Sequence, residues 1–416
     1  MSIYISYEAV TNNKEIFGQV LHQICNKIEA EWIEDEDYYG IHVCPLGDIF
    51  FEFGKEDGDN QRWHVSGECQ TNLIGPGFHK CIVDILDELQ EKVGIVFQVS
   101  DETNYYEDRD FQRLKSENFY GWLKSLITVL DDKYKSGEYV ALCVCWDIDN
   151  YQPEEIAGTI VTPFGRYDIT SLNIQVKSKG IEEFAREFFI WNDICKDAKF
   201  YRNCGLKLMW EDCYFMSGAR SDEDNRINTK IISYLERAAV LDKTLPFPKE
   251  DYVFLCNLND KKPMDITQYP NYNSEYPIGF RKDWIRITMG KLSISMPGNF
   301  LYEYGDDGDN LWYDNNEKNW KNIRITGLSR KSGNAEFRDQ EWETLQGKFV
   351  ELTCGDGTLR YHFQGETEEN GYAYYFASGE AICDNSLYLI SVCYENEKDS
   401  IWAKEFFERL RCRSNQ

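Results

Sequence analysis

The residues with the clearest chemical potential are His79 and Cys81, near the start of a predicted helix. A thiol at a helix N-terminus beside an imidazole ionises readily, because the helix dipole and a protonated imidazole both stabilise a thiolate. Such a thiolate would serve as the nucleophile of covalent catalysis. Cys81 also falls close to the apolar stripe of the same helix, where a small thiol packs like a hydrophobic residue. We favour the packed thiol.

A second candidate is the carboxylate pair Asp147 and Asp149, which follows the apolar run Tyr139–Trp146. That run is typical of a buried strand, and ligands often bind where a sheet strand ends. Two carboxylates at such a place can act as acid and base in hydrolysis. A hydrolase that combines them with the His–Cys pair is therefore one hypothesis. The similar segment further along the chain does not support it, because Asp260 and Lys262 take the corresponding positions there.

A third candidate is an acidic, aromatic loop between residues 101 and 108. Tyrosines give a large contact area at low entropic cost, and flanking acids attract a basic partner. The alternative is an ordinary solvated connection. The residues that would touch a partner are Asp101, Glu102, Tyr105, Tyr106 and Glu107.

No pattern indicates a metal or a cofactor. The 14 cysteines are scattered and include no C-x-x-C pair, so zinc is disfavoured. In a chain of this length they predict reduced, mostly buried thiols in the cytosol and no disulfide framework. Gly75-Pro76-Gly77 precedes a helix and offers backbone N–H groups to an anion, but no nucleotide-binding motif surrounds it. We expect no cofactor and no metal.

The charge of the chain restricts its partners. With 72 acidic and 45 basic residues, the formal net charge is −27. This charge repels phosphate, so nucleic acid and anionic membranes are disfavoured, while a basic protein is compatible with it. The sequence contains no run of eighteen apolar residues and no recognisable signal peptide. We expect a cytoplasmic protein.

The N-terminal region predicts helices and strands in alternation. Asn12 and Glu15 resemble the start of a helix, and apolar residues at helical spacing extend it over 13–32. Pro45 and Gly47 indicate a tight turn between two strands. The expected strands are 39–44, 48–54, 61–66 and 95–99, and the expected helices are 78–92 and one that begins at Phe111.

Two short sequence matches suggest that this region contains an internal repeat. The turn at Pro45–Gly47 returns at Pro163–Gly165, and Tyr139–Cys143 resembles Tyr252–Cys256 in the same order. We therefore predict two related α+β modules, 1–150 and 151–260, by internal duplication. In the second module the expected elements are helices 181–195 and 226–241 and strands 205–215 and 251–256.

Residues 261–282 are rich in Pro, Tyr and Asn and predict a linker to a third domain, 283–416. Strands are expected at 285–288, 292–295, 322–328, 348–353, 358–364, 372–378 and 387–394, with a helix over 397–411. The strand Leu292–Pro297, the strand Tyr388–Val392 and the helix Trp402–Leu410 resemble the layout of PsbP-like α/β domains. That family has no single catalytic set, so the resemblance implies a sandwich-like fold and no site residues.

The sequence thus predicts an α+β protein with two tandem related modules and a C-terminal sheet domain. Acidic charge, abundant aromatic residues and the lack of a catalytic motif favour a non-enzymatic interaction module. Its partner would be a basic protein, for instance a toxin that it masks as an immunity protein does. The alternative is a hydrolase with its site between the two repeats. The oligomeric state stays open.

Overall fold

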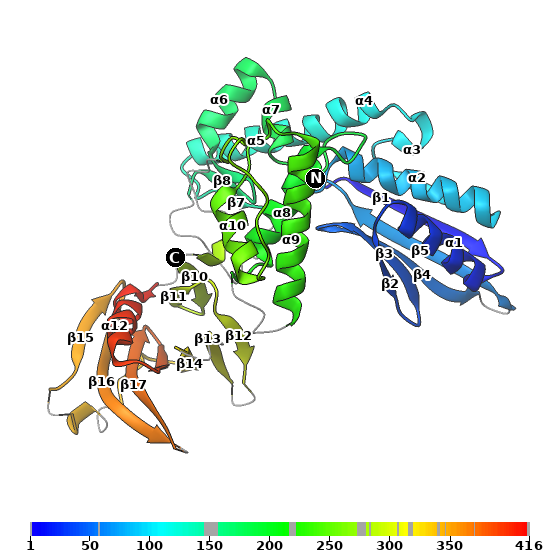
Figure 1. The fold of residues 1–416 in the computed structure, drawn as a ribbon. Helices are drawn as coiled ribbons and strands as arrows, with labels where there is room; N and C mark the ends of the chain where they lie inside the picture. The colour runs from blue at the N-terminus through cyan, green and yellow to red at the C-terminus, as the bar shows by residue number, and fades with distance from the viewer. Residues whose placement is uncertain are drawn as a thin grey trace. The chain divides into compact units, whose positions relative to one another are not determined.

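The computed structural model describes residues 2–56, 59–144, 157–215, 222–272, 280–282, 284–305, 308–314, 319–338, 342–345, 347–369 and 371–413. The fold is α+β and divides into two compact units. The first comprises Met1–Cys145, Ile156–Asp212 and Ile227–Ile278, and most of the second is Gly279–Gln416 (Figure 1). No helix within the described ranges is long and apolar enough to cross a membrane.

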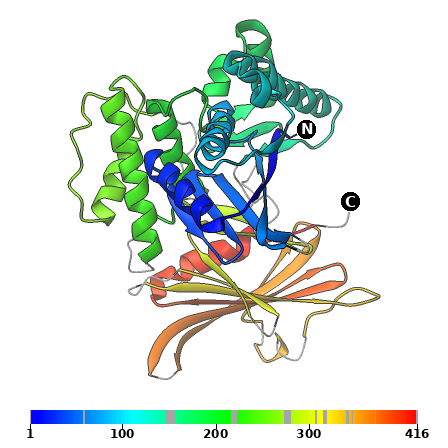
Figure 2. The same ribbon diagram turned by 90° about the vertical axis from the view of Figure 1, so that its right-hand side faces the viewer.

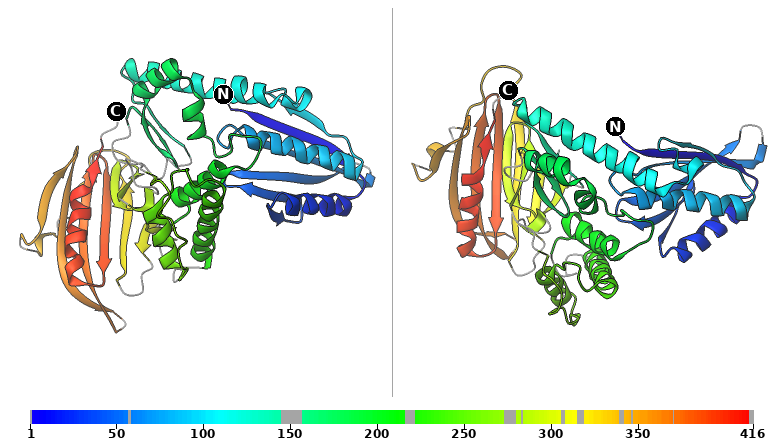
Figure 3. Two further views of the ribbon diagram at one scale, coloured as in Figure 1. Left: turned by 45° about the horizontal axis from the view of Figure 1, so that its top comes forward. Right: turned by 90° about the horizontal axis from the view of Figure 1, so that it is seen from above.

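The first unit begins with a six-stranded antiparallel sheet of order β2-β3-β4-β5-β1-β6. Helices α1 (Lys14–Lys27) and α2 (Pro76–Val93) cover one side of this sheet, as the view from above in Figure 3 shows. The strands are β1 (Tyr4–Thr11), β2 (Glu31–Glu34), β3 (Tyr38–Cys44), β4 (Gly47–Glu56), β5 (Asp59–Gln70) and β6 (Gln98–Asp101).

Strict alternation along β1 sets the two sides of the sheet. Ile5, Tyr7 and Ala9 are buried beneath the helices, while Ser6 and Glu8 point to the other side. The predicted turn at Pro45 is confirmed, because β3 ends at Cys44 and β4 begins at Gly47.

Helix α1 begins one residue after the predicted start, with Asn13 and not Asn12 as its cap, and it ends early. The Asn13 side chain accepts a hydrogen bond from the Ile16 N–H at 2.9 Å, which caps the first turn. The helix stops at Lys27, and Glu29 takes a left-handed φ of 56°. The prediction that it continues to residue 32 is wrong, because Trp32 lies in β2 and packs against Tyr39 of β3.

From Tyr105 to Leu258 the chain is mainly helical and carries one small sheet. In that sheet β7 (Ala141–Cys143) runs parallel to β8 (Thr159–Thr162), and β8 runs antiparallel to β9 (Gly165–Asp168). The helices are α3 (Tyr105–Asp108), α4 (Phe111–Arg113), a π-helical turn (Leu114–Phe119), α5 (Tyr120–Lys135), α6 (Ile169–Lys179), α7 (Glu182–Arg186), α8 (Ala198–Glu211), α9 (Asp222–Leu241) and α10 (Lys249–Leu258).

The structure does not support the internal duplication. The second hairpin exists as β8 and β9, but most of the strand predicted at 205–215 belongs to helix α8, which ends at Glu211. The strand predicted at 251–256 is helix α10, so this segment resembles β7 in sequence but not in structure. Most of the two predicted modules also falls in one compact unit. The element order of one half is therefore not repeated in the other.

Both wrong strands have a physical explanation. Helix α8 is buried along nearly its whole length, so it lacks the polar face that reveals a helix in a sequence. In α10, Tyr252, Leu255 and Cys256 are buried at helical spacing, and Glu250 and Asp251 favour a helix start. The helix predicted over 181–195 is only the short α7.

The second unit contains a seven-stranded antiparallel sheet of order β12-β13-β14-β18-β17-β16-β15 and a three-stranded one, β10-β11-β19. Helix α12 (Ser400–Arg409) lies along one face of the larger sheet (Figure 2), where Phe407 stacks on Tyr361 at 4.7 Å. The seven predicted strands of this region are confirmed as β10 (Trp284–Met289), β11 (Leu292–Pro297), β14 (Lys321–Ser329), β15 (Val350–Cys354), β16 (Gly357–Glu369), β17 (Tyr372–Cys383) and β18 (Ser386–Tyr394). Three further strands were not predicted: β12 (Leu301–Tyr304), β13 (Asp309–Asp314) and β19 (Arg411–Cys412).

The expectation that all cysteines are reduced needs a correction, because Cys383 and Cys412 form a disulfide. The two cysteines are 29 positions apart in the sequence, and strand β19 brings them together. The spacing of the cysteines alone does not predict this pair. The other described cysteines form no disulfide, and most are buried.

Candidate functional site

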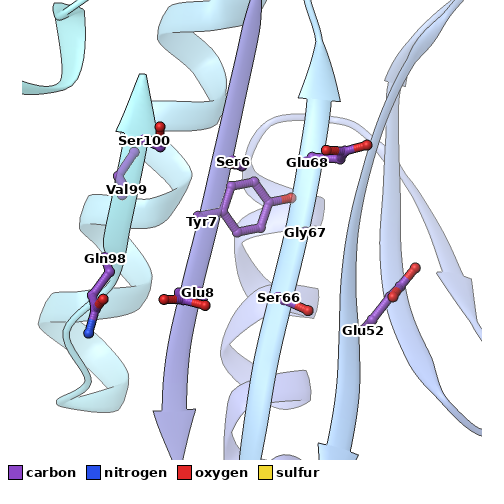
Figure 4. A pocket seen from close by; sticks show the side chains of 10 residues that line it. All are labelled: Ser6, Tyr7, Glu8, Glu52, Ser66, Gly67, Glu68, Gln98, Val99 and Ser100. Atoms are coloured by element: carbon purple, nitrogen blue, oxygen red, sulfur yellow. The ribbon is translucent and has the colours of Figure 1, made fainter. Parts of the chain in front are cut away.

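The side of the six-stranded sheet that α1 and α2 leave uncovered carries a hollow of about 690 Å³. We call this side the open face. Figure 4 shows it with the helices behind the strands. The residues that line the hollow come from β1, β4, β5 and β6: Ser6, Tyr7, Glu8, Glu52, Ser66, Gly67, Glu68, Gln98, Val99 and Ser100.

The strand register places the polar side chains of the hollow in rows. Glu8 stands opposite Ser66, which stands opposite Glu52, so a hydroxyl separates two carboxylates. Adjacent strands are about 4.8 Å apart, so the backbones at Glu8 and Glu52 lie roughly 10 Å apart. In the neighbouring row Ser6 stands opposite Glu68. The open face therefore presents three separated carboxylates with hydroxyls among them.

The hollow lies where β4 and β5 separate. Their pairing ends at Glu52–Ser66, although both strands continue. Beyond that point the Tyr7 hydroxyl donates to the Phe50 carbonyl at 2.8 Å. Burial raises the pKa of Tyr7 well above its ordinary value, so the hydroxyl remains a donor.

Gly67 lets these groups approach. A Cβ at this position would lie 2.2 Å from the Phe50 carbonyl oxygen and 2.6 Å from the Tyr7 ring. No residue larger than glycine fits without a shift of backbone, so Gly67 fixes the shape of the hollow floor.

The carboxylates of the open face have few internal partners. Glu8 lies 3.5 Å from the imidazole of His64. Within the part of the chain that the structure describes, neither Glu52 nor Glu68 forms an ion pair. Because the protein itself leaves these two charges uncompensated, the hollow is suited to a cationic group.

In the predicted contact loop, some of the residues are buried and others are exposed. Asp101 is buried with 3% of its side chain exposed, and Tyr105 is buried with 4%. These two residues are therefore unavailable to a partner, which corrects the interpretation of the loop as one contact surface. Glu102 and Glu107 are exposed. Tyr106 is half-buried under the Arg109 guanidinium, 4.7 Å from its ring centre.

Asp101 has a structural role. It accepts hydrogen bonds from the Thr103 N–H at 2.8 Å and the Tyr106 N–H at 2.9 Å, and its carboxylate lies 3.2 Å from His79 Nε2. Burial of Asp101 opposes ionisation, but the hydrogen bond and charge of His79 outweigh it and hold the Asp101 pKa far below its usual range. On its other side His79 Nδ1 lies 3.1 Å from the Thr71 hydroxyl. This network ties β6 and the loop after it to α2.

The two described residues of the hydrolase hypothesis, His79 and Cys81, lack the properties of catalytic groups. His79 is fully buried in the network just described. Cys81 is also buried, and burial raises the pKa of its thiol to about 12, the opposite of an activated nucleophile. Asp147 and Asp149 lie outside the described residues.

The glycine segment before α2 is not an anion site. The Gly77 N–H donates to the Trp191 carbonyl at 3.0 Å, and the Phe78 and His79 N–H groups donate to Gly75. The Trp191 indole fills the space over Gly77, where a Cβ would lie 2.1 Å from the ring. Among the described residues, no group of three or more His, Cys, Asp or Glu could hold a metal ion.

Comparisons with known proteins leave the chain without a family. No protein-family model matches it, and no curated protein does. A crystal structure of a protein from Bacteroides thetaiotaomicron VPI-5482 is similar over 30% of this chain and 46% of that one, with 16% identity and a TM-score of 0.25. A likeness at this level carries no argument about fold or function.

Proposed function

We propose that the protein is a non-enzymatic interaction module that binds a basic protein partner through the open face. The observation that carries this proposal is the set of three carboxylates, Glu8, Glu52 and Glu68, on the side of the sheet that the helices leave uncovered. Two of them have no internal counter-charge among the described residues.

The spacing of the carboxylates suits a protein partner. Carboxylates on strands whose backbones lie roughly 10 Å apart are reached by different Lys or Arg residues more readily than by one small cation. The hydroxyls of Ser6 and Ser66 and the amide of Gln98 supply polar contacts between the charged positions. The net charge of −27 would steer a basic partner toward the chain from a distance. Masking of a basic toxin, as an immunity protein does, is the form of binding that this chemistry fits.

The test is the affinity of the full chain for a fluorescein-labelled oligo-lysine peptide, measured by fluorescence anisotropy. The variant Glu8→Gln/Glu52→Gln/Glu68→Gln keeps the shape of the side chains and removes three charges from the open face. We expect its Kd to rise by about tenfold or more, since each exposed charge pair contributes a modest share.

A matched control separates the site from the overall charge. Glu91→Gln/Asp132→Asn/Glu183→Gln removes the same number of charges from exposed helical or helix-flanking positions. We expect its Kd to change by less than about twofold, because screening weakens distant charges. Equal weakening in both variants would contradict a specific role of the open face.

A further inference from the structure

Three cysteines from three separate segments meet in the second unit. Cys383 at the end of β17 and Cys412 in β19 form the disulfide. The Sγ atom of Cys354, at the end of β15, lies 3.5 Å from the Sγ atom of Cys412. Because Cys412 is disulfide-bonded and carries no sulfur-bound hydrogen, any hydrogen bond between these sulfurs is donated by the Cys354 thiol. The free thiol is therefore already in contact with the disulfide.

The backbone around Cys412 fixes this contact. Cys412 pairs with Leu292 of β11 on one side and forms an isolated bridge to Gly355 on the other. A Cβ on Gly355 would lie 2.4 Å from the Cys412 carbonyl oxygen, and a Cβ on Gly357 would lie 2.5 Å from the Cys412 sulfur. Only glycines at these two positions let β19 lie against the β15–β16 turn, so the third thiol is held beside the disulfide by the fold.

All three sulfur atoms are buried from solvent. Cys354 has no exposed surface, and Cys383 and Cys412 are 2% and 3% exposed. A bulky thiol from solution has poor access to such a disulfide, whereas an internal thiol at contact distance reacts at a high effective concentration. The geometry therefore favours reaction within the cluster over reaction with an outside thiol.

We propose that Cys354, Cys383 and Cys412 form a thiol–disulfide exchange unit in which Cys412 pairs alternatively with Cys383 or with Cys354. The Cys354 thiol loses its proton, and the thiolate attacks Cys412 Sγ. Because burial raises the pKa of this thiol, the attack becomes faster at alkaline pH. A bond forms between the Cys354 and Cys412 sulfurs while the bond between Cys412 and Cys383 breaks. The electron pair leaves with Cys383, which takes up the proton. The exchange has no net oxidation and needs no external reductant.

The exchange moves the covalent tie of the C-terminal strand. In one state β19 is tied to the end of β17, and in the other it is tied to the end of β15, the edge strand of the seven-stranded sheet. Strand β19 directly follows α12, so both states hold that helix to the sheet domain. The free thiol therefore moves from Cys354 to Cys383.

Peptide mapping of the full chain tests this unit. The wild type and the variants Cys383→Ser and Cys354→Ser are reduced in denaturant and refolded in oxidised and reduced glutathione at mildly alkaline pH, so that the reagent reaches every cysteine before the fold buries it. Free thiols are then alkylated and the disulfide-linked peptides are identified by mass spectrometry without reduction. In Cys383→Ser we expect a Cys354–Cys412 disulfide in most molecules, and in Cys354→Ser only Cys383–Cys412.

Quantitative alkylation of Cys354 in Cys383→Ser as well as in the wild type would overturn the proposal. Far-UV circular dichroism checks that each variant is folded, and Cys383→Ala replaces Cys383→Ser if the hydroxyl prevents folding. Cys393→Ser is the matched control, because Cys393 lies in the same sheet outside this cluster and forms no disulfide. We expect that variant to keep the wild-type disulfide pattern.

Discussion

At the scale of single residues, two acidic groups of similar appearance in the sequence have opposite roles. Asp101 lies in an acidic, aromatic loop but is buried, and it holds His79, Thr103 and Tyr106 in place. Glu68 lies in an unremarkable strand but is exposed on the open face without an ion pair among the described residues. Burial and partners, not the local density of acidic letters, decide which carboxylate is available for binding.

We predict that Asp101→Asn lowers the free energy of unfolding by about 3 kcal/mol at neutral pH, because it breaks a buried charged network. The Asp101 pKa is depressed in the folded state, so its stabilisation is complete above the unfolded-state value of about 4 and is lost as the pH falls below it. Urea unfolding monitored by fluorescence between neutral pH and about pH 3 measures both effects.

The wild type should therefore lose stability on acidification more steeply than Asp101→Asn does. The exposed Asp132→Asn is the control, and we expect it to change the unfolding free energy by less than about 0.5 kcal/mol. Parallel pH profiles for wild type and Asp101→Asn would show that the carboxylate does not stabilise the fold through its charge.

At the scale of elements, the sequence was informative where one face of an element is polar. The helix near residue 14, the turn at Pro45 and most strands after residue 283 were predicted because local residue preferences agree with their tertiary surroundings. Helix α8 was missed because it is buried on all sides and has no polar face. Helix α10 was missed because its aromatic residues are typical of a strand.

The candidate site was only partly visible in the sequence. The alternation of polar residues at 6 and 8, at 66 and 68 and at 98 and 100 indicates strands with one solvated side. The register that places Glu8, Ser66 and Glu52 in one row depends on which strands pair, and β1 lies between β5 and β6 despite their distance in sequence. Pairing of this kind follows from packing of the whole sheet and not from any local pattern.

The separation of β4 and β5 gives a prediction at this scale. We expect Gly67→Ala to lower the free energy of unfolding by about 2 kcal/mol, because its Cβ would be forced against the Phe50 carbonyl and the Tyr7 ring. Gly54→Ala in β4 is the control, since a Cβ there meets no atom within 4 Å. Urea unfolding of both variants measures the difference, and equal stability of the two would contradict the tight contact at Gly67.

At the scale of the whole molecule, the charge of the chain contributes to binding, whereas its disulfide contributes to structure. The net charge of −27 acts over long distances and is weakened by salt, whereas the open face acts only where its three carboxylates lie. In the second unit the disulfide and the third thiol fix the C-terminal strand and play no part in the proposed binding.

We predict that raising the salt concentration weakens binding of the oligo-lysine peptide to the wild type. The slope of log Kd against log salt should be smaller for Glu8→Gln/Glu52→Gln/Glu68→Gln, because fewer charged contacts remain to be screened. Anisotropy titrations over a range of sodium chloride concentrations measure the slopes. Identical slopes for the two proteins would place the charged contacts elsewhere.

The central claim is that the open face is where a basic partner binds, and carbodiimide cross-linking tests it most directly. The reagent joins a lysine amine to a carboxylate in direct contact, so the oligo-lysine peptide marks the carboxylates that it touches in the full chain. Mass mapping should find the cross-links concentrated at Glu8, Glu52 and Glu68. Cross-links of equal yield at Glu91, Asp132 and Glu183, which lie outside the open face, would contradict the claim.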